Sequence, residues 1–436
     1  MNWILRHRLR LYFRNSIWIL PSLSIVAALA SVWLIARYEH SIGARDQISA
    51  ETARTVLSMV AASTFTLVVL ASSALLLAVQ LASAQLTPRI ISMVYRNGYQ
   101  KLAFALFVFI FTFSAAVLAR VDEWVPPVAS RLAAYGFLLT LGLYIFFVDQ
   151  IGKMLRPSSA LRAVALTARD VIRVMYPSSL KEDSPPSRSV QSLTEGEPRV
   201  VPSDKDGAVL AFDLKGLVGL AERSNSFFEL VPEVGQYIAE GEPLFRIYQG
   251  GENLDDTRLQ NSVAVGSERT LEQDPLFAFR IIVDIASKAL SPAINDPTTA
   301  VLAIDQIHHL LRDIGKRYLA EGRESDRSGR VRLFYRTPNW EDFVVLSTTE
   351  IRHYGRESIQ VQRRLRAMLK DLIETLPARR APVLQKELAL LAMSSKRAFP
   401  DLDDQTLAEA RDMQGIGGSY DDVSESNTSA RATAAT

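Results

Sequence analysis

Long runs of apolar residues dominate the first third of the chain. Four of them are long enough to cross a bilayer, which requires about 20 mostly apolar residues. They cover about Ile17 to Ala36, Ala61 to Ala82, Leu102 to Val121 and Val128 to Val148. The first run is longer than the ~7–15-residue core of a signal peptide and ends at no clear cleavage site, so we expect an anchor. Pro21 lies inside this run and predicts a kink.

The hydrophobic pattern changes after residue 157, which we take as the end of a four-helix transmembrane domain (1–157). Residues 158–198 are expected to form an amphipathic helix, ended by Pro177, and then a linker rich in Ser, Pro and Glu. Residues 199–416 are expected to form a cytoplasmic α+β domain. Residues 417–436 are rich in Gly, Ser, Asp and Thr and predict a disordered tail.

Short apolar runs separated by turn residues predict strands in the first part of the α+β domain, at 208–212, 227–231 and on both sides of Gly241. The stretch VGQYIAEGEPLF (234–245) resembles one hairpin of a biotinyl- or lipoyl-type barrel, so we expect a small barrel-like β part. Carriers of that type need a modifiable Lys, and none occurs between Gly216 and Ser287. Helices are predicted at 213–223, 340–354, 357–376 and 381–396, and the fold class is thus a helical membrane bundle plus an α+β domain with several helices.

Basic residues are distributed unevenly between the two sides of the four spans. Ten lie on the side of the N-terminus, namely Arg6, Arg8, Arg10, Arg14, Arg89, Arg96, Lys101, Lys153, Arg156 and Arg162. Five lie on the other side, namely Arg37, Arg45, Arg54, Arg120 and Arg131. Because Lys and Arg are retained in the cytoplasm, this bias predicts a multi-pass protein of the cytoplasmic (inner) membrane with both termini in the cytoplasm.

Composition narrows the chemistry further. The 436 residues carry a formal net charge of +2, which gives no general case for nucleic-acid binding. Cys is absent, which excludes disulfides, thiolate zinc sites and thiol catalysis. No phosphate loop, dinucleotide fingerprint or nucleophile elbow occurs, so no cofactor, metal or catalytic residue is assigned and an enzyme is the least supported class. His308 and His309 are adjacent on a predicted helix and point apart, so they do not form a metal pair.

The second apolar run carries both small and polar residues. Ala71, Ala74, Ala78 and Ala82 would allow close contact between helices. The polar residues in or just beyond the run that we consider as a membrane path are Ser72, Ser73, Gln80 and Gln85. Such residues either form hydrogen bonds between helices or line a path for water. Both interpretations remain open at the level of sequence.

The most distinctive motif comprises RTLEQDP (269–275) and ALSPAINDPTTA (289–300). Both Asp-Pro pairs are typical of helix starts, with Asp as the cap and Pro at the first helical position. The candidate polar cluster around these starts comprises Arg269, Thr270, Gln273, Asp274, Arg280, Asp284, Asn295 and Asp296. The cluster either pins helices to the β part or binds an anionic ligand at the two helix N-termini.

These two segments, together with QLASAQLTPR (80–89), resemble the bacterial family of predicted membrane proteins called domain of unknown function 2254. The resemblance extends over nearly the whole chain. It implies four membrane spans and a cytoplasmic domain, and it implies no activity.

Positive charge is also concentrated on the last predicted helices, at Arg363, Arg364, Arg366, Lys370, Arg379 and Arg380. We expect a solvated basic face there; a helix that contacts an anionic membrane surface is the alternative.

Two functional hypotheses follow from the sequence. The first is a homo-oligomeric channel or transporter-like protein in the bilayer that is gated by its cytoplasmic domain. The second is a non-conducting membrane-anchored sensor or scaffold whose soluble domain binds a ligand or a protein. The solute or ligand is not specified by any motif.

Overall fold

The computed structural model of the chain describes residues 3–42, 49–91, 98–121, 125–181, 196–319 and 322–418. The chain divides into two compact units. The helical unit is Leu9–Ser159, and the α+β unit combines Met1–Arg8 with Ala160–Thr436. Most of the predicted linker and nearly all of the predicted disordered tail lie outside the described residues.

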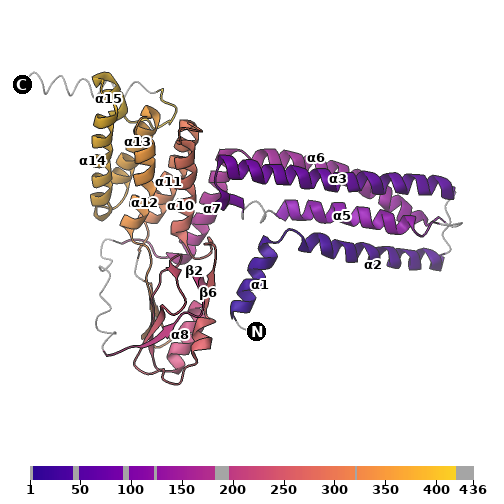
Figure 1. Ribbon diagram of the computed structural model, residues 1–436, viewed down its shortest axis with the longest axis horizontal. Coiled ribbons are helices and arrows are strands. Elements are labelled where there is room, and N and C mark those ends of the chain that lie inside the picture. Colours follow the sequence, from indigo (N-terminus) through magenta and orange to yellow (C-terminus); the bar gives the residue numbers. More distant parts are fainter. Residues whose placement is uncertain are drawn as a thin grey trace, which may run out of the picture. The chain divides into compact units, whose positions relative to one another are not determined.

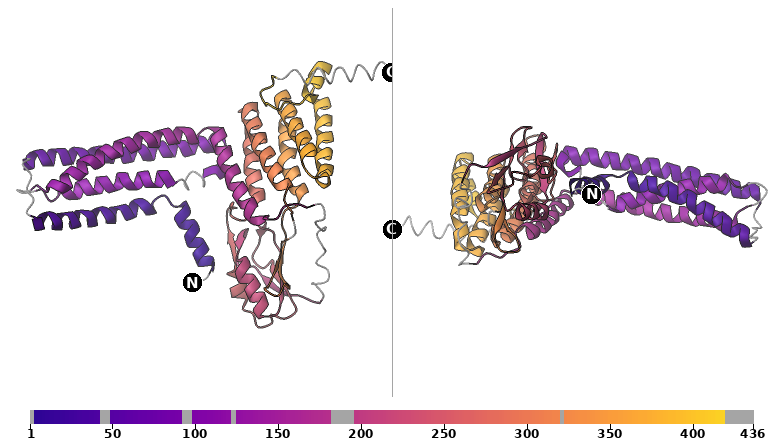
Figure 2. Two further views of the ribbon diagram at one scale, coloured as in Figure 1. Left: turned by 180° about the vertical axis from the view of Figure 1, so that it is seen from behind. Right: turned by 90° about the horizontal axis from the view of Figure 1, so that it is seen from below.

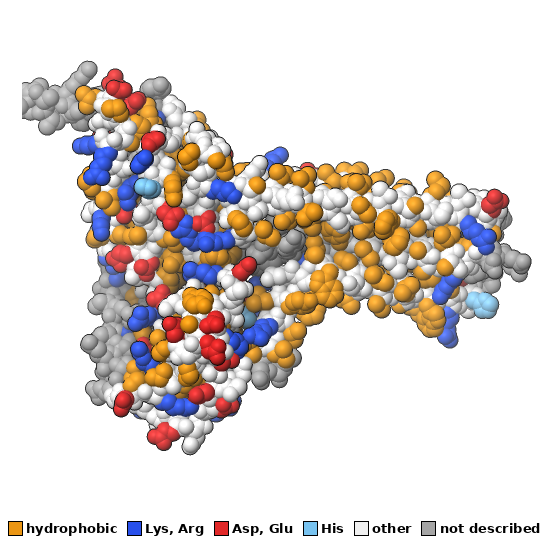
Figure 3. All heavy atoms as spheres, in the orientation of Figure 1, with side chains coloured by type: hydrophobic (Ala, Val, Ile, Leu, Met, Phe, Trp, Pro, Cys, Tyr) orange, Lys and Arg blue, Asp and Glu red, His pale blue; other side chains and the backbone are white. Residues whose placement is uncertain are grey.

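Four helices in the described part of the chain are long and apolar enough to cross a membrane. They are α2 (Ile19–Ile42), α3 (Ala50–Gln85), α5 (Gly98–Leu118) and α6 (Pro127–Met154), and they lie side by side in both views of the helical unit (Figures 1 and 2). The four predicted apolar spans are therefore confirmed. Figure 3 shows that one face of this unit is covered mainly by hydrophobic side chains. Such a surface suits contact with lipid.

The helices of this unit differ in length. α3 has 36 residues and is therefore about 54 Å long, which exceeds the ~30 Å thickness of a bilayer's hydrocarbon core. Figure 1 shows α3 and α6 continuing past the first residues of α2 and α5. The predicted kink at Pro21 is wrong, because α2 begins only two residues earlier. A proline in the first turn of a helix breaks no hydrogen bond.

The interior of the helical unit is mainly apolar. One buried cluster includes Ala28, Leu57, Phe113 and Ala133, which come from all four long helices. Glu39 is a buried acidic residue in this interior, and its side chain is fully buried near the end of α2. Its Oε1 accepts hydrogen bonds from the first backbone amides of α6, which have no partner within their own helix.

The strands of the α+β unit form two sheets. A five-stranded sheet has the order β1 (Arg199–Pro202), β5 (Pro243–Tyr248), β3 (Phe227–Leu230), β8 (Val331–Tyr335) and β7 (Gly322–Ser325). Only the β3–β8 pair in it is parallel. A three-stranded antiparallel sheet has the order β4 (Tyr237–Ile238), β2 (Gly207–Phe212) and β6 (Val263–Gly266). Both orders are open, so no closed barrel is found among the described strands.

The two sheets share one hydrophobic core. Val209, Phe212 and Val263 of the smaller sheet belong to the same buried cluster as Phe228 and Phe245 of the larger one. α8 (Leu214–Arg223) adds Leu217 and Leu220 to this cluster, and α9 (Asp256–Gln260) adds Leu259. The alternation of apolar residues therefore predicted the strands. Which face of each strand is buried depends on how the two sheets pack against each other.

The rest of the α+β unit is a helical layer (Figure 1). It consists of α10 (Pro275–Ala289), α11 (Pro297–Gly315), α12 (Trp340–Tyr354), α13 (Ile359–Thr375), α14 (Ala381–Ala398) and α15 (Leu402–Glu409). α7 (Pro157–Met175) precedes the sheets, and the Tyr176 ring after it packs edge-on against Phe343 of α12. α1 (Trp3–Asn15) and the short 3-10 helices η1 (Pro88–Ile90) and η3 (Ala378–Arg380) complete the described elements.

The predicted solvated basic face of α13 is wrong. Arg363, Arg364 and Arg366 are only 2%, 6% and 6% exposed. Arg363 donates hydrogen bonds to the carbonyls of Gly417 and Arg411, in the segment that follows α15. The sequence of α13 looks solvated because it is rich in Arg, but α11 and the segment that follows α15 cover it.

Candidate functional site

The eight residues of the candidate polar cluster do not meet at one point. Asp274 begins α10, whereas the backbone amide of Asp296 donates to Ala289 at the other end of the same helix. α10 has 15 residues and is therefore about 22 Å long. The structure thus divides the cluster into a group at the start of α10, a group along its side and a group at its end.

The group at the start of α10 is built around a buried carboxylate. Asp274 is 3% exposed, and its Oδ1 accepts a hydrogen bond from the backbone amide of Phe277 at 2.9 Å. Its Oδ2 accepts from Nε and Nη2 of Arg269 at 3.0 and 2.7 Å. Burial raises the pKa of Asp274, and the Arg269 guanidinium opposes that shift.

Gly235 packs directly against this ion pair. Its φ of +89° favours glycine, and a Cβ placed there would lie 2.0 Å from Nη2 of Arg269 and 2.4 Å from Oδ2 of Asp274. The glycine is recognisable in the sequence as a turn residue, but its contact with Arg269 is not. The turn between β3 and β4 therefore fixes the position of the pair.

Gln273 and Thr270 complete this group. The Gln273 side chain accepts from the backbone amide of Phe212 and donates to its carbonyl, at 3.1 and 3.3 Å, so it joins α10 to the end of β2. Oγ1 of Thr270 is buried and has no hydrogen-bond partner among the described residues. Arg269 has a side chain that is 37% exposed. This is where a small anion from solvent could reach the cluster.

The group along the side of α10 links two helices. Arg280 donates from Nε to Asp284, one turn later, at 2.6 Å. Its Nη1 and Nη2 donate to the two oxygens of Glu350 on α12, at 2.5 and 2.6 Å. These acceptors raise the pKa of Arg280, with Glu350 the largest cause. Sequence reasoning missed this role of Glu350, because no local signal relates positions 70 residues apart.

The group at the end of α10 starts the next helix. Asp296 accepts from the backbone amide of Thr299 at 3.0 Å and from its hydroxyl at 2.5 Å, which caps α11. Asn295 precedes it with a φ of +47°, a conformation that Asn tolerates better than most residues. Pro292, Ala293 and Ile294 of the same loop are exposed.

The four polar residues considered as a membrane path lie on the outside of α3. Ser72, Ser73, Gln80 and Gln85 are all exposed. Ala71, Ala78 and Ala82 of the small-residue set are buried at 0%, 3% and 5% exposure. Within a single chain, the three buried alanines therefore face the bundle, while Ser73, Gln80 and Gln85 face away from it.

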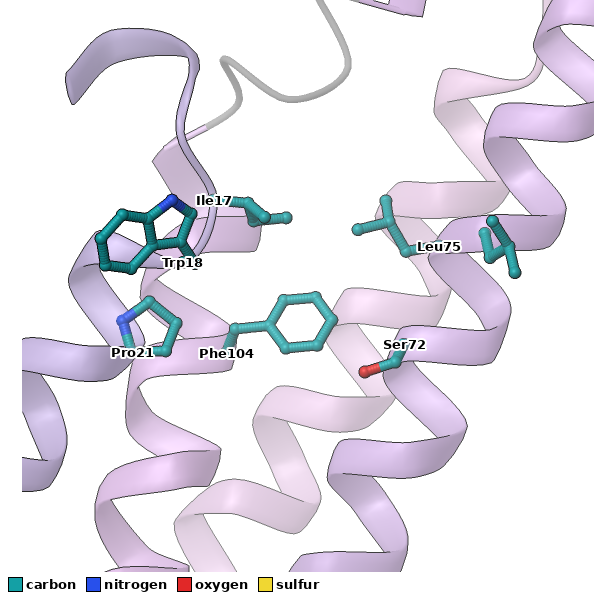
Figure 4. Close-up of a pocket in the computed structure, with 7 residues that line it drawn as sticks. Ile17, Trp18, Pro21, Ser72, Leu75 and Phe104 are labelled. Carbon is teal, nitrogen blue, oxygen red and sulfur yellow. The ribbon is translucent and has the colours of Figure 1, made fainter. Parts of the chain in front are cut away.

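Ser72 also lines a cavity of about 360 Å³ in the helical unit (Figure 4). The other lining residues are apolar, namely Ile17, Trp18, Pro21, Leu75, Leu76 and Phe104. They come from the start of α2, from α3 and from α5. In Figure 4 the Phe104 ring lies between Pro21 on one side and Ser72 and Leu75 on the other. The cavity size is in the range of small-molecule sites.

One further polar network joins α11 to α13. Nε2 of His308 lies 2.7 Å from Oδ2 of Asp371, and its Nδ1 lies 3.1 Å from Nη2 of Arg364. Because a guanidinium only donates, Nδ1 must accept and Nε2 must carry the proton. Burial lowers the pKa of His308, and Asp371 opposes that shift. Within the described ranges, no three acidic or His side chains are grouped to hold a metal ion.

A family described as Predicted membrane protein (DUF2254) matches residues 14–371. The chain belongs to this family. The match runs from before α2 into α13, so it includes all four apolar helices, both Asp-Pro helix starts and the cavity. Membership establishes a membrane protein and leaves its activity open.

Relatives of this DUF2254 protein occur in mycobacteria. The uncharacterized protein Mb1321c of Mycobacterium bovis is 26% identical over 419 residues, which cover 91% of this chain and 79% of the relative. The uncharacterized protein Rv1290c of Mycobacterium tuberculosis gives the same identity and the same coverage. No solved structure matches the chain.

Proposed function

We propose that this protein is a homo-oligomer of the cytoplasmic membrane whose copies together form a path for a small solute, with the α+β unit as its regulator. The observation that carries this proposal is an exposed stripe on α3, consisting of Ala62, Thr66, Val69, Ser73 and Gln80. We call it the α3 stripe.

The α3 stripe has the spacing of a helix–helix contact. Its members follow one another at steps of four, three, four and seven residues, which is the heptad pattern of left-handed helix pairs. Four of the five are small or polar, and all five are exposed in the single chain. Small residues let two helix backbones approach closely, as in other membrane interfaces.

Energetics favour covering the stripe with another copy. Ser73 and Gln80 form no side-chain hydrogen bond with described residues, and lipid offers their polar groups no partner. A hydrogen bond between membrane helices contributes about 0.6 kcal/mol on average. Ser73 and Gln80, two of the four residues expected to line a path, belong to the stripe. Ser72 and Gln85 lie outside it, so the path in this proposal lies between copies and not through one bundle.

The orientation in this proposal places both termini in the cytoplasm. It is supported by the excess of Lys and Arg at the N-terminal side of the four spans. The α+β unit, which follows the last apolar helix, then also lies in the cytoplasm. There it is positioned to respond to a cytoplasmic ligand.

Oxidative cross-linking tests the oligomer directly, because the chain has no native Cys. Thr66→Cys and Ser73→Cys should each form covalent dimers in native membranes. Ser63→Cys, exposed roughly 90° around α3 from the middle of the stripe, is the control and should form far fewer dimers. Equal cross-linking at all three positions, or a strictly monomeric mass in mild detergent, would contradict the proposal. Solute flux into liposomes that depends on Ser73 and Gln80 would support the path itself.

A second candidate function is a membrane-anchored sensor or scaffold. It is favoured by the position of the four polar residues outside the bundle, because a single copy then offers no polar route along them. Its ligand site in this proposal is the group at Arg269 and Thr270, where a half-exposed guanidinium lies near a buried hydroxyl that lacks a partner. An anion of the size of phosphate or a carboxylate matches these groups.

Thermal unfolding with phosphate, nucleotides and small carboxylic acids tests the ligand site of this second candidate. A ligand that binds only the native state at a hundredfold excess over its Kd stabilises it by about 2.7 kcal/mol. Arg269→Ala should abolish such a rise in Tm, while Arg246→Ala, at an exposed arginine of β5, should leave it intact. No rise with any of these compounds would count against the sensor.

A further inference from the structure

The cavity beside Trp18 has a wall suited to hydrocarbon. Six of its seven lining residues are apolar, and the hydroxyl of the seventh, Ser72, donates to the carbonyl of Val68 at 2.8 Å. Apart from the indole N–H of Trp18, the wall therefore presents no polar group that lacks a hydrogen-bond partner. Its volume of about 360 Å³ accommodates part of an acyl chain. A ligand recognised by hydrogen bonds inside the cavity is not expected.

The cavity lies where the helical backbone is interrupted between α1 and α2. α1 ends at Asn15 and α2 begins at Ile19, so Ile17 and Trp18 turn into the wall while α3 continues beyond them. Trp18 is 56% exposed, as expected for an aromatic residue at the boundary between hydrocarbon and headgroups. This exposure fits a cavity near that boundary.

Two basic residues, Arg14 and Lys101, each precede a lining residue of the cavity by three positions. Lys101 precedes the lining residue Phe104 by three positions on α5, so both side chains lie on one face of the helix. Nζ of Lys101 donates to the carbonyls of Phe13 and Arg14 at 3.3 and 2.5 Å, which places the backbone of Arg14 beside it. An apolar cavity with basic residues close to its lining segments matches an anionic amphiphile.

We propose that this cavity binds one acyl chain of an anionic phospholipid, with its phosphate held by Lys101 and Arg14. The charge at the rim selects the anionic headgroup, and the apolar wall selects the chain. The site lies entirely within the helical unit, so the proposal holds whether or not the protein conducts a solute.

Quenching of Trp18 fluorescence by brominated lipid tests this site. Trp18 would be the only tryptophan, the other four being replaced by Phe, in phosphatidylcholine vesicles that contain phosphatidylglycerol. Bromine on the phosphatidylglycerol chains should quench Trp18 more strongly than bromine on an equal amount of phosphatidylcholine. The preference should fall about fivefold in Lys101→Gln and persist in Lys101→Arg. Leu138→Trp in the tryptophan-free protein is the control for bulk lipid, because Leu138 is 61% exposed on α6.

Filling the cavity gives a second measurement that needs no tryptophan replacement. In the protein that keeps all its tryptophans, Ser72→Phe should bind one phosphatidylglycerol fewer than the wild type, as counted by native mass spectrometry. Ser73→Phe, at the neighbouring exposed position outside the cavity, should retain it. A Trp18 signal without preference between the two lipids, or a lipid that survives Ser72→Phe, would overturn the proposal. A Trp18 that neither lipid quenches would also overturn it and would assign the cavity to a second copy.

Discussion

Glu39 at the end of α2 caps the first turn of α6 through the backbone amide of Val128, at 2.5 Å. The same oxygen accepts from Ala129 at 3.1 Å, and the side chain is fully buried. A negative charge at a helix N-terminus is favourable, because the amides there lack intrahelical acceptors. This hydrogen bond joins two helices through residues that are 89 positions apart in the chain.

Replacing Glu39 should destabilise the helical unit. Glu39→Leu leaves two buried amides without an acceptor, which costs about 1–3 kcal/mol each when no water replaces it. We expect a clear fall in Tm in mild detergent. Glu51→Leu is the control, since Glu51 is exposed in the first turn of α3. Equal Tm values for the two variants would show that the cap contributes nothing.

Gly235 should be irreplaceable for two separable reasons. Gly235→Ala places a Cβ in a backbone conformation that costs non-glycine residues about 1–2 kcal/mol. It also displaces the Arg269–Asp274 pair, whose atoms would lie within 2.4 Å of the new Cβ. Gly241→Ala has a similar φ of +86° and nothing within 4 Å, so it should show the backbone cost alone. The difference between the two free energies of unfolding measures the contact, and a difference near zero would contradict it.

Arg280 and Glu350 should show measurable coupling in a double-mutant cycle. Arg280→Met and Glu350→Gln each break a pair with two hydrogen bonds, so we expect a coupling of about 0.5–3 kcal/mol in urea unfolding. The Arg356–Glu357 pair is 55% and 74% exposed and serves as the control. Exposed pairs usually contribute ~0–1 kcal/mol. A coupling energy between Arg280 and Glu350 no larger than that of the control would show that this contact stabilises the fold no more than an exposed ion pair does.

His308 should make the α+β unit sensitive to acid. Its pKa in the folded protein is lowered by burial, so below the ordinary value of 6.5 the unfolded chain binds a proton that the folded chain does not. Stability is therefore present above pH 6.5 and is lost as pH falls through the folded pKa. His308→Gln should remove this dependence of Tm on pH, whereas His353→Gln, at an exposed position, should retain it. Parallel pH profiles for wild type and His308→Gln would refute this linkage.

Thiol labelling tests the orientation of the chain. Ser41→Cys, exposed at the end of α2, should react with an impermeant reagent added outside intact cells. Glu240→Cys, exposed in the α+β unit, should react only after the membrane is opened. The reversed pattern would place the α+β unit outside and overturn the charge-based orientation.

Features that depend on neighbours in the chain were predictable from the sequence. The four apolar helices follow from local hydrophobicity, which is enough to identify a span. Asp274-Pro275 and Asp296-Pro297 start helices because each Asp caps its helix through the backbone amide three positions ahead. α12 begins at Trp340 and ends at Tyr354, as its apolar spacing predicted.

Features that depend on distant segments were decided by the tertiary structure. The eight residues of the polar cluster bracket one predicted helix and were considered as a single cluster, but that helix of 15 residues holds Asp274 and Asp296 at opposite ends. Arg280 found its partner on α12, and β3 paired in parallel with β8, which aligns Phe228 with Leu333. In each case the partner is fixed by packing, which has no local signature.

The sequence by itself determined that this protein has four membrane-length helices and where most of its helices begin. It also determined which segments form strands, through their alternating apolar residues. It did not determine which side of each helix is covered. Ser73 and Gln80 face outward and Arg363 is buried, although their local sequences suggested the opposite. The physical reason is that a side chain's burial depends on what packs over it, and for Arg363 that cover comes from the segment at Arg411 and Gly417.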